Sequence, residues 1–304
     1  MITRIQDGVY LIDTMALGVR EFVAAYLLVD EKTALIDTGY ASSLNVLLSD
    51  IKSIGLDPSM LDYIIVTHVH LDHAGAAGSL IKTATNAKVL AHPRGVKHLV
   101  DPTRLISSVE EIYGQVAALF GKVEPIPPEQ VSSVEDCARV SLGKMRLKFV
   151  HTQGHAPHHI CVYEETNSFL FTGDVISGTY PSFPVFVPPS VPPSFDYHGL
   201  IEDLKRLMKL EPKLLMVPHF GVRQASKSVF EGEISLLNWW KDFISSEKES
   251  GDVELITDAA CKALAKKFGV NVKEVPDYVR TSIKLAVEGM LGYLERSATQ
   301  GRES

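Results

Sequence analysis

Cysteine is scarce in this 304-residue chain, which contains only Cys137, Cys161 and Cys261. Their odd number and wide separation predict reduced core thiols and exclude the disulfide framework of a small secreted domain. The sequence also lacks a stretch of about 18 apolar residues and a basic start followed by an apolar run, so neither a transmembrane helix nor a signal peptide is predicted. We therefore expect a cytoplasmic protein with no membrane partner.

An excess of positive charge is also missing. The chain has 30 Lys and Arg against 37 Asp and Glu, a formal net charge of −7. Because proteins that bind nucleic acid present a basic surface, we expect no nucleic-acid partner. Hydrophobic residues make up 45% of the chain, enough for the full core of one soluble enzyme domain with a small appendage.

Histidine, in contrast, is concentrated in one short string, THVHLDHAG. His68, His70, Asp72 and His73 lie within six residues there. Imidazole and carboxylate are the usual ligands of a catalytic divalent metal. The preceding LDYIIVT is typical of a buried strand and the following AGAAGSLIK of a helix start. Since open α/β folds place their chemistry at the carboxyl ends of strands, the string favours a metal site over a histidine-rich surface loop.

Three further polar residues end hydrophobic runs elsewhere in the chain. His155 follows MRLKFV in TQGH, Asp174 follows SFLF in FTGD, and His219 follows KLLMV in VPHFG. Each has a neighbouring glycine or proline that lets the chain turn sharply. Four strand ends that all terminate in His or Asp are hard to explain by structure alone, so we expect these residues to complete a metal-binding set.

Together these motifs resemble the metallo-β-lactamase superfamily, in its glyoxalase II-like dinuclear branch, over about residues 1–222. The resemblance implies an α+β four-layer αββα sandwich and two divalent metal ions, zinc before iron or manganese. Asp37, in ALIDTG, is similar to the strand-ending aspartate that orients metal ligands in that family. The implied ligands are His68, His70 and His155 for one ion, Asp72, His73 and His219 for the other, and Asp174 as the bridge between them.

Departures from related branches narrow the expected activity. Asp174 stands near the position where the main class of β-lactamases carries cysteine, which argues against antibiotic hydrolysis. His70 stands where flavodiiron proteins carry glutamate, which argues against oxygen reduction. Ser177 stands where quorum-type lactonases carry tyrosine, although Tyr180 is close by in the sequence. Persulfide dioxygenases keep much the same ligand string with a single iron, so they stay open as an alternative.

The resemblance therefore implies a metal-dependent hydrolase of a small-molecule substrate. A metal-bridging hydroxide would attack a thioester, an ester or lactone, or a phosphoester, with Asp72 or a bound water managing the proton. One alternative is a mononuclear iron persulfide dioxygenase. Another, a non-enzymatic metal-binding or nucleic-acid-binding module, is disfavoured by the complete ligand set and the acidic charge.

Hydrophobic patterning divides the chain into two parts. Strands are expected at 9–13, 24–29, 33–37 and 88–92, a helix at 42–55, and a second β-rich half from residue 139 to Asp174. We expect a catalytic domain over 1–225 and a helical region over 226–304, with a break at Gly251 and a last helix starting near Pro276. The helical region could complete the active-site cleft or form the interface of a homodimer.

Two segments between these elements have alternative interpretations. Residues 104–122 have helical apolar spacing, which predicts either a core-packing helix or one that overhangs the metal cleft and shapes an acyl or leaving-group pocket. Residues 178–193 are rich in proline, which predicts a rigid loop without regular structure. Tyr180, Phe183 and Phe186 would give that loop an apolar face, as a wall of the substrate pocket, a dimer contact or plain surface.

The remaining histidines carry less information. We expect His92, His98, His151 and His198 to lie at the surface or to support the metal ligands. His158 and His159 lie close to His155 in the chain and are expected to assist the ligands rather than to bind metal themselves, with contact to the substrate as the alternative for either residue.

Overall fold

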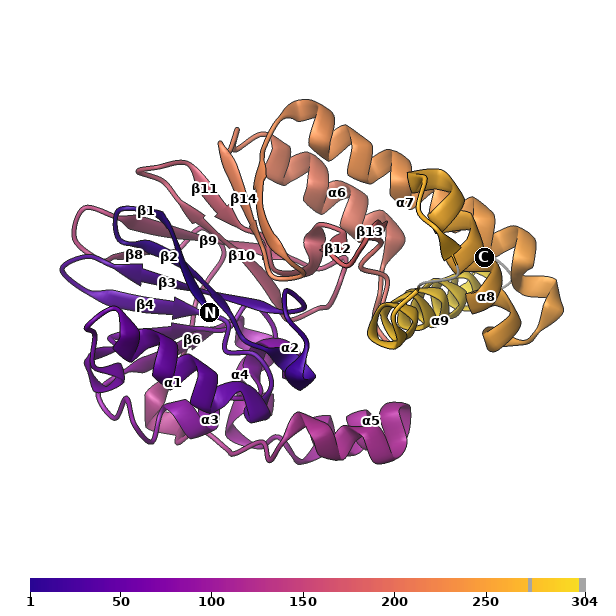
Figure 1. Cartoon of the computed structure of the whole chain (residues 1–304). Coiled ribbons are helices and arrows are strands. Elements are labelled where there is room, and N and C mark those ends of the chain that lie inside the picture. Colours follow the sequence, from indigo (N-terminus) through magenta and orange to yellow (C-terminus); the bar gives the residue numbers. More distant parts are fainter. Residues whose placement is uncertain (273–274, 301–304) are drawn as a thin grey trace. The chain divides into compact units, whose positions relative to one another are not determined.

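The computed structural model describes residues 1–272 and 275–300, which form two compact units (Figure 1). Unit 1 comprises residues 1–151, 158–173 and 213–223. Unit 2 comprises residues 152–157 and 174–212 and the described residues from 224 onward. These units interleave along the chain, because segments 152–157 and 174–212 group by contacts with the residues from 224 onward. The functional domain division stays a prediction.

Unit 1 contains a seven-stranded sheet whose strands follow chain order. Its members are β1 (Ile2–Gln6), β2 (Val9–Asp13), β3 (Ala24–Val29), β4 (Thr33–Ile36), β5 (Tyr63–Ile65), β6 (Lys88–Ala91) and β7 (Val131–Ser133). The first four are antiparallel, and β4 to β7 are parallel. The expected strands all form, whereas β1 and β7, which lack a clear apolar alternation, were not predicted from the sequence.

A second, six-stranded sheet has the order β15-β14-β11-β10-β9-β8. Its strands are β8 (Arg139–Ser141), β9 (Arg146–Thr152), β10 (His159–Glu164), β11 (Phe169–Phe171), β14 (Leu214–Val217) and β15 (Gly221–Gln224). The strands β11 and β14 are parallel, with Phe171 opposite Met216. The β-rich half that the sequence predicted is therefore present, and β14 joins it from a distant part of the chain.

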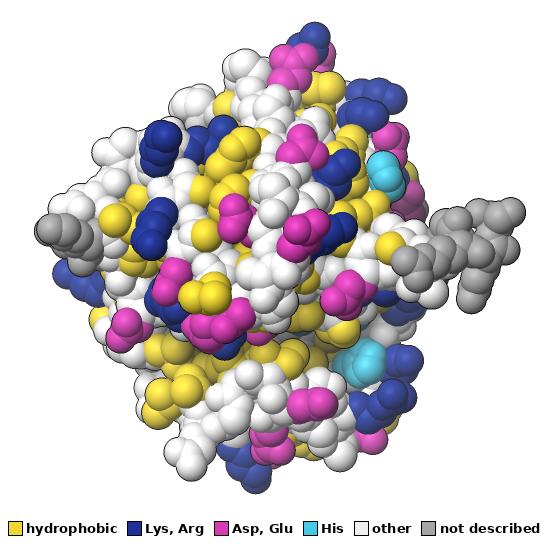
Figure 2. Space-filling model, turned by 90° about the vertical axis from the view of Figure 1, so that its right-hand side faces the viewer, with side chains coloured by type: hydrophobic (Ala, Val, Ile, Leu, Met, Phe, Trp, Pro, Cys, Tyr) yellow, Lys and Arg dark blue, Asp and Glu magenta, His cyan; other side chains and the backbone are white. Residues whose placement is uncertain are grey.

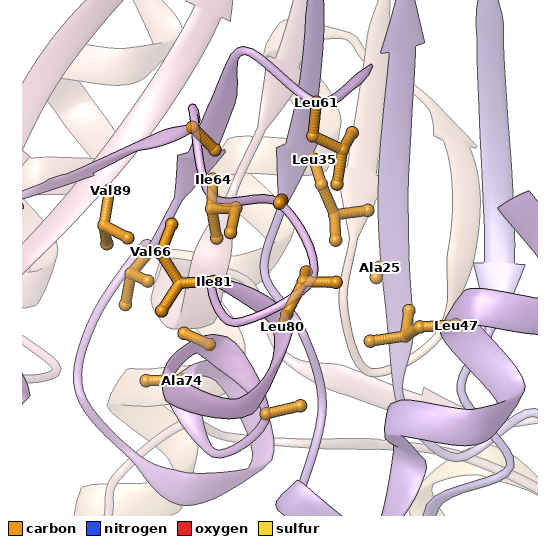
Figure 3. Packing of buried hydrophobic residues seen from close by; sticks show 14 of the residues in the cluster. Ala25, Leu35, Leu47, Leu61, Ile64, Val66, Ala74, Leu80, Ile81 and Val89 are labelled. Atoms are coloured by element: carbon orange, nitrogen blue, oxygen red, sulfur yellow. The ribbon is translucent and has the colours of Figure 1, made fainter. Parts of the chain in front are cut away.

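Helices cover one face of the seven-stranded sheet, and the six-stranded sheet covers the other. The helices of unit 1 are α1 (Leu44–Ser53), α2 (Leu71–Ala74), α3 (Ala77–Leu80), α4 (Pro93–Val100) and α5 (Thr103–Tyr113). Leu47 of α1 and Leu80 of α3 pack on Leu35 and Ile64 (Figure 3). Neighbouring residues of the same strands, such as Ile36, point the other way and join the core between the sheets. Alternation with period two thus builds two cores from one sheet.

Unit 2 combines a two-stranded hairpin with helices. The hairpin consists of β12 (Gly178–Tyr180) and β13 (Phe183–Val187), and the helices are α6 (Tyr197–Met208), α7 (Lys227–Glu247), α8 (Val253–Phe268) and α9 (Asp277–Gln300). Ser226 and Asp252 cap α7 and α8 by accepting from backbone N–H groups. The expected helical region is present, and residues 273–274 of the interruption before α9 lie outside the described residues.

Short 3-10 turns complete the fold. They are η1 (Ala16–Gly18), η2 (Ala41–Ser43), η3 (Pro58–Met60), η4 (Gly114–Phe120), η5 (Pro128–Gln130), η6 (Gly173–Val175) and η7 (Lys248–Ser250). Over residues 1–272 and 275–300, none of the helices combines the length and the apolar character needed to cross a bilayer.

Two expectations about the intervening segments need correction. The proline-rich segment is not irregular, because β12 and β13 pair within it. Pro184 is exposed and lies, with Val185, in the irregular part of the register between the paired residues Phe183 and Phe186, a position where a strand tolerates proline. Residues 104–122 do not form one helix, since α5 ends at Tyr113 and η4 follows. No side chain of α5 is fully buried, and Leu105 alone among them packs against the core cluster, so α5 is not a core helix.

Candidate metal centre

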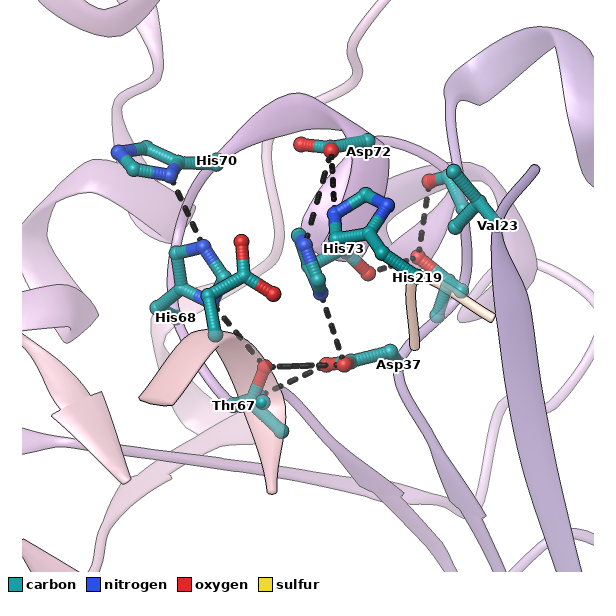
Figure 4. Close-up of polar contacts among 12 residues, drawn as sticks. Val23, Asp37, Thr67, His68, His70, Asp72, His73 and His219 are labelled. Carbon is teal, nitrogen blue, oxygen red and sulfur yellow. Dashed lines mark hydrogen bonds and ion pairs between the residues drawn. The ribbon is translucent and has the colours of Figure 1, made fainter. Parts of the chain in front are cut away.

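The histidine-rich string forms the connection from β5 to α2, and a buried carboxylate holds it in place. Asp37, at the end of β4, is 3% exposed. Its carboxylate accepts hydrogen bonds from the Thr67 backbone N–H at 2.8 Å and from the Thr67 hydroxyl at 2.9 Å (Figure 4). Asp37 has a φ of 59°, a left-handed conformation that Asp tolerates better than most residues. The end of one strand thereby anchors the loop that leaves the next.

The same carboxylate orients His73. Its Oδ2 atom lies 2.9 Å from Nδ1 of His73, which is fully buried. A carboxylate at Nδ1 favours the proton on that nitrogen and leaves the lone pair on Nε2. The Nε2 atom of His73 is 3.6 Å from Oδ2 of Asp72, and Nε2 of His219 is 3.3 Å from the same oxygen. The candidate ligand atoms of these three residues lie within 4.8 Å of one another, so they could hold one metal ion.

His219 follows β14, and a buried tyrosine holds the backbone on both sides of it. The hydroxyl oxygen of Tyr26 lies 2.8 Å from the carbonyl oxygen of Val217 and 3.0 Å from that of Gly221. Burial raises the pKa of Tyr26 well above its usual value, so the phenol keeps its proton. Tyr26 was not identified from the sequence, where its one signal is a hydroxyl in the middle of the apolar run AAYLLV.

His68 and His70 form a pair in unit 1. The Nδ1 atom of His68 lies 3.1 Å from the Thr67 hydroxyl, which donates its own proton to Asp37. The hydroxyl oxygen can therefore accept from His68 Nδ1–H, leaving the lone pair on Nε2. That Nε2 atom is 2.9 Å from Nδ1 of His70. Asp37 thus orients His73 directly and His68 through Thr67.

His155 and Asp174 form a pair in unit 2. The Nδ1 atom of His155 lies 2.8 Å from the carbonyl oxygen of Pro189, which can only accept a proton. The Nε2 lone pair of a neutral His155 is therefore 3.5 Å from Oδ2 of Asp174. A lone pair beside a carboxylate needs a positive charge nearby, either a proton or a metal ion. This donor chemistry fits a divalent cation.

The turn before His155 is tightly built. The Asp203 carboxylate on α6 accepts hydrogen bonds from the backbone N–H groups of Gln153 and Gly154, both at 2.8 Å. A Cβ at Gly154 would lie 2.1 Å from the backbone nitrogen of Leu200, so only glycine fits there. Burial raises the pKa of Asp203 to about 6. Asp203 was not identified from the sequence, because it lies about fifty residues from the turn that it holds.

The other histidines surround or lie apart from this centre. The ring centroids of His158 and His159 lie 6.4 and 5.0 Å from that of His68, and a role in assisting the ligands stays a prediction. His98 lies 6.2 Å from His158. His92 caps α4 by accepting from the Arg94 backbone N–H, and burial lowers its pKa to about 4. The ring centroid of His151 lies 4.2 Å from that of His92. The ring of His198 packs on that of Tyr197.

The expected pocket residues have packing partners within unit 2. Tyr180 and Phe183 are buried, and Phe186 is half-buried. The Tyr180 ring lies 5.8 Å from that of Tyr278, and the Phe186 ring 5.3 Å from that of Phe268. These contacts attach the hairpin to α8 and α9, so packing accounts for much of its apolar surface. A role as the wall of a substrate pocket stays a prediction.

Comparisons with known proteins show the family of the chain. The model of the metallo-β-lactamase superfamily matches residues 18–219. The metallo-β-lactamase fold-containing protein ST1585 of Sulfurisphaera tokodaii is 32% identical over 258 residues, covering 83% of this chain and 90% of that protein. The chain therefore belongs to the metallo-β-lactamase superfamily, whose members are typically metal-dependent hydrolases.

Solved structures share the fold. The crystal structure of ST1585 from Sulfolobus tokodaii has a TM-score of 0.69 and 27% identity, covering 95% of this chain and 98% of that one. The metallo-β-lactamase family protein TTHA1429 from Thermus thermophilus has a TM-score of 0.71 at 19% identity, covering 97% and 95%. The predicted metallo-β-lactamase fold with a C-terminal helical region is confirmed.

Relatives with other activities occur in the same superfamily. A nitric oxide reductase of Moorella thermoacetica is 28% identical over 183 residues, which is 56% of this chain but 40% of that protein. Family membership therefore supports metal-dependent chemistry in general and leaves the reaction to be proposed.

Proposed function

We propose that the protein is a metal-dependent hydrolase of the glyoxalase II-like kind, acting on an ester-like bond of a small molecule. The candidate bonds are a thioester, an ester or lactone, and a phosphoester. The observation that carries the proposal is the set of histidines whose Nδ1 atoms are held by Asp37, Thr67 and Pro189. Each of these contacts directs an Nε2 lone pair toward other candidate ligands, as metal binding requires.

The proposed ligands fall into two sets. Asp72, His73 and His219 would hold one ion, supported by their grouping in unit 1. His68 and His70 would hold the other together with His155, and Asp174 would be shared, as in the superfamily pattern. Two divalent ions, with zinc proposed first because His and Asp also accept iron or manganese, would supply Lewis acidity and a hydroxide nucleophile at neutral pH.

The side chains of the protein have separate tasks in this proposal. Asp37 and Thr67 keep His73 and His68 in the tautomers that present Nε2. Asp72 lies between His73 and His219, and its carboxylate would hold the proton released during attack on the substrate. Asp174, as an oxygen ligand where β-lactamases of the main class carry cysteine, supports a substrate other than a β-lactam.

Surface charge agrees with a small-molecule substrate. On the face shown in Figure 2, acidic and basic side chains are interspersed with hydrophobic ones. With a net charge of −7, the chain has none of the overall basic character that binding to a nucleic-acid backbone requires. We propose no nucleic-acid partner.

The deciding experiment joins metal analysis to a substrate panel. The purified protein would be analysed for bound metals and assayed on thioesters, esters, lactones and phosphodiesters. We expect about two metal ions per chain and hydrolysis of one class. His70→Asn should lower both readouts, whereas His198→Asn, outside the proposed ligand set, should lower neither. One tightly bound iron per chain with oxygen consumption on a persulfide would establish the dioxygenase alternative instead.

A further inference from the structure

A cavity of about 780 Å³ lies in unit 1 beside the start of α2. Its lining is mostly apolar and includes Leu71 together with Ile106, Val109, Ala117 and Ala118 of α5 and η4. This volume is within the range of about 300–1,000 Å³ that is typical of sites for small molecules. The cavity is therefore large enough for a substantial part of a substrate.

The segment that forms the cavity wall is attached to the body of unit 1 near both of its ends. Leu105 packs against the helix-covered core of the seven-stranded sheet. At the other end the buried Phe120 ring stacks on Tyr40, with centroids 4.5 Å apart. A Cβ at Gly121 would lie 2.6 Å from the backbone nitrogen of Ser42, so the backbone passes close to η2 there. Between these attachments Ile106 and Val109 stay half-buried and face the hollow.

Leu71 connects the cavity to the metal loop. It lines the cavity, is 7% exposed, and stands in the chain between His70 and Asp72. A group bound in the cavity therefore contacts the residue that lies between two proposed metal ligands in the chain, although no proposed ligand lines the cavity itself. This position favours part of the substrate as the occupant over a partner protein.

We propose that this cavity binds the uncharged apolar acyl group of the substrate, a medium-length alkyl chain or an aryl ring, with the scissile bond at the metal ions. The proposal rests on the hydrolase function proposed above. The charged lining residues do not contradict an uncharged ligand, because Glu110 is exposed and Lys122 pairs with Glu124 at 2.8 Å, its side chain 84% exposed. The apolar walls would then determine the preference for acyl chain length.

Two isoleucines of the same helix provide a matched test. Ile106 lines the cavity, whereas Ile112, also on α5, is 44% exposed and is not among the lining residues. Each would be replaced by Asp, and KM measured on nitrophenyl esters from acetate to decanoate. Ile106→Asp should raise the ratio of KM for the decanoate ester to KM for the acetate ester at least about tenfold. Ile112→Asp should leave the ratio of the two KM values unchanged.

A binding measurement separates this proposal from the hydrolase function. Decanoate would be titrated into the zinc-loaded protein while methyl resonances of Ile106, Val109 and Ile112 are followed by NMR. We expect shifts at Ile106 and Val109 and none at Ile112. Such shifts without hydrolysis of any thioester, ester, lactone or phosphodiester of the panel would support the cavity site and contradict the proposed function.

Two results would overturn the cavity proposal. The first is ester hydrolysis whose chain-length preference is unchanged in Ile106→Asp, with no methyl shift at Ile106. The second is a solution mass of two chains that falls to one in Ile106→Asp, because a second copy would then occupy the cavity.

Discussion

The hydroxyl of Tyr26 lies 2.8 Å from the carbonyl oxygen of Val217, two residues before His219. The same hydroxyl reaches Gly221, two residues after it. The phenol of Tyr26, on β3, therefore holds the backbone on both sides of His219. This proposed ligand lies almost two hundred residues away in the chain. His219 owes its position to this contact as well as to its own strand.

Tyr26→Phe should weaken binding of the metal ion at Asp72, His73 and His219. Phe keeps the edge-to-face packing on Phe171 but removes the hydroxyl, whose single proton is shared between the carbonyl oxygens of Val217 and Gly221. We expect a loss of zinc affinity of about 10- to 100-fold, the usual effect of removing a group that positions a metal ligand. Chelator competition measures this affinity. Tyr63→Phe, a change outside the site, is the control. Unchanged zinc affinity in Tyr26→Phe would show that the contact of the Tyr26 hydroxyl with the backbone around His219 is not needed for metal binding.

Asp174→Ala should abolish most of the activity, because it removes the proposed bridge between two ions. We expect the wild-type chain to bind close to two metal ions and the variant to bind fewer. Elemental analysis of both proteins, purified in parallel, measures this. Equal metal content in the two proteins would refute the bridging role.

Activity should decline as the pH falls below neutrality. Metal ligation needs neutral imidazoles and ionised carboxylates, and the proposed nucleophile needs a deprotonated water with a pKa near 7. The measurement is kcat/KM against pH with metal content checked at each point. A rate that stays flat from pH 8 down to about pH 4 at full occupancy would contradict a hydroxide nucleophile.

His92 should make folding stability depend on pH. Burial lowers its folded-state pKa from 6.5 to about 4, so the unfolded chain binds a proton first as the pH falls. The stabilisation is full above pH 6.5 and is lost between about pH 6.5 and 4. His92→Asn keeps a side chain that can cap α4 and removes this titration.

Urea unfolding at pH 7 and pH 5 tests the role of His92. The wild-type chain should lose more stability between these two values than His92→Asn, by about 1 kcal/mol after allowance for solvent screening. His198→Asn serves as the control and should lose as much as the wild type. Equal losses of unfolding free energy in the wild type and in His92→Asn would mean that the pKa of His92 is the same in the folded and the unfolded chain.

Phe183→Ala should destabilise the protein without changing its metal content. The Phe183 side chain is 1% exposed in β13, so its removal leaves a cavity in unit 2. We expect a loss of about 3–5 kcal/mol in the free energy of unfolding. Phe186→Ala removes a half-buried ring and should lower the free energy of unfolding by less. It is therefore the more suitable variant for testing substrate preference. A stability loss in Phe183→Ala below that of Phe186→Ala would contradict the packing described for this hairpin.

The sequence by itself determined the family, the fold and the candidate ligands. These features are readable because they are local: THVHLDH is contiguous, and each other proposed ligand directly follows an apolar run. Strand alternation and helix periodicity are equally local, so most strands and the C-terminal helices were predicted. The short strands β1 and β7 were not predicted, because their residues lack that pattern. These strands form by pairing with their neighbours in the sheet.

Only the tertiary structure decided how these ligands are supported. Tyr26 reaches from the seven-stranded sheet to the residues that flank His219 at the end of β14 in the six-stranded sheet. Asp203 holds the turn before His155 from a separate helix. The hairpin at 178–187 forms despite its prolines, and α5 leaves its apolar side chains beside a cavity instead of burying them. A hydrogen bond or a packing contact between distant segments does not change the hydrophobic periodicity of either segment, so it cannot be read from the sequence. Such contacts exist only once the sheets have brought the segments together.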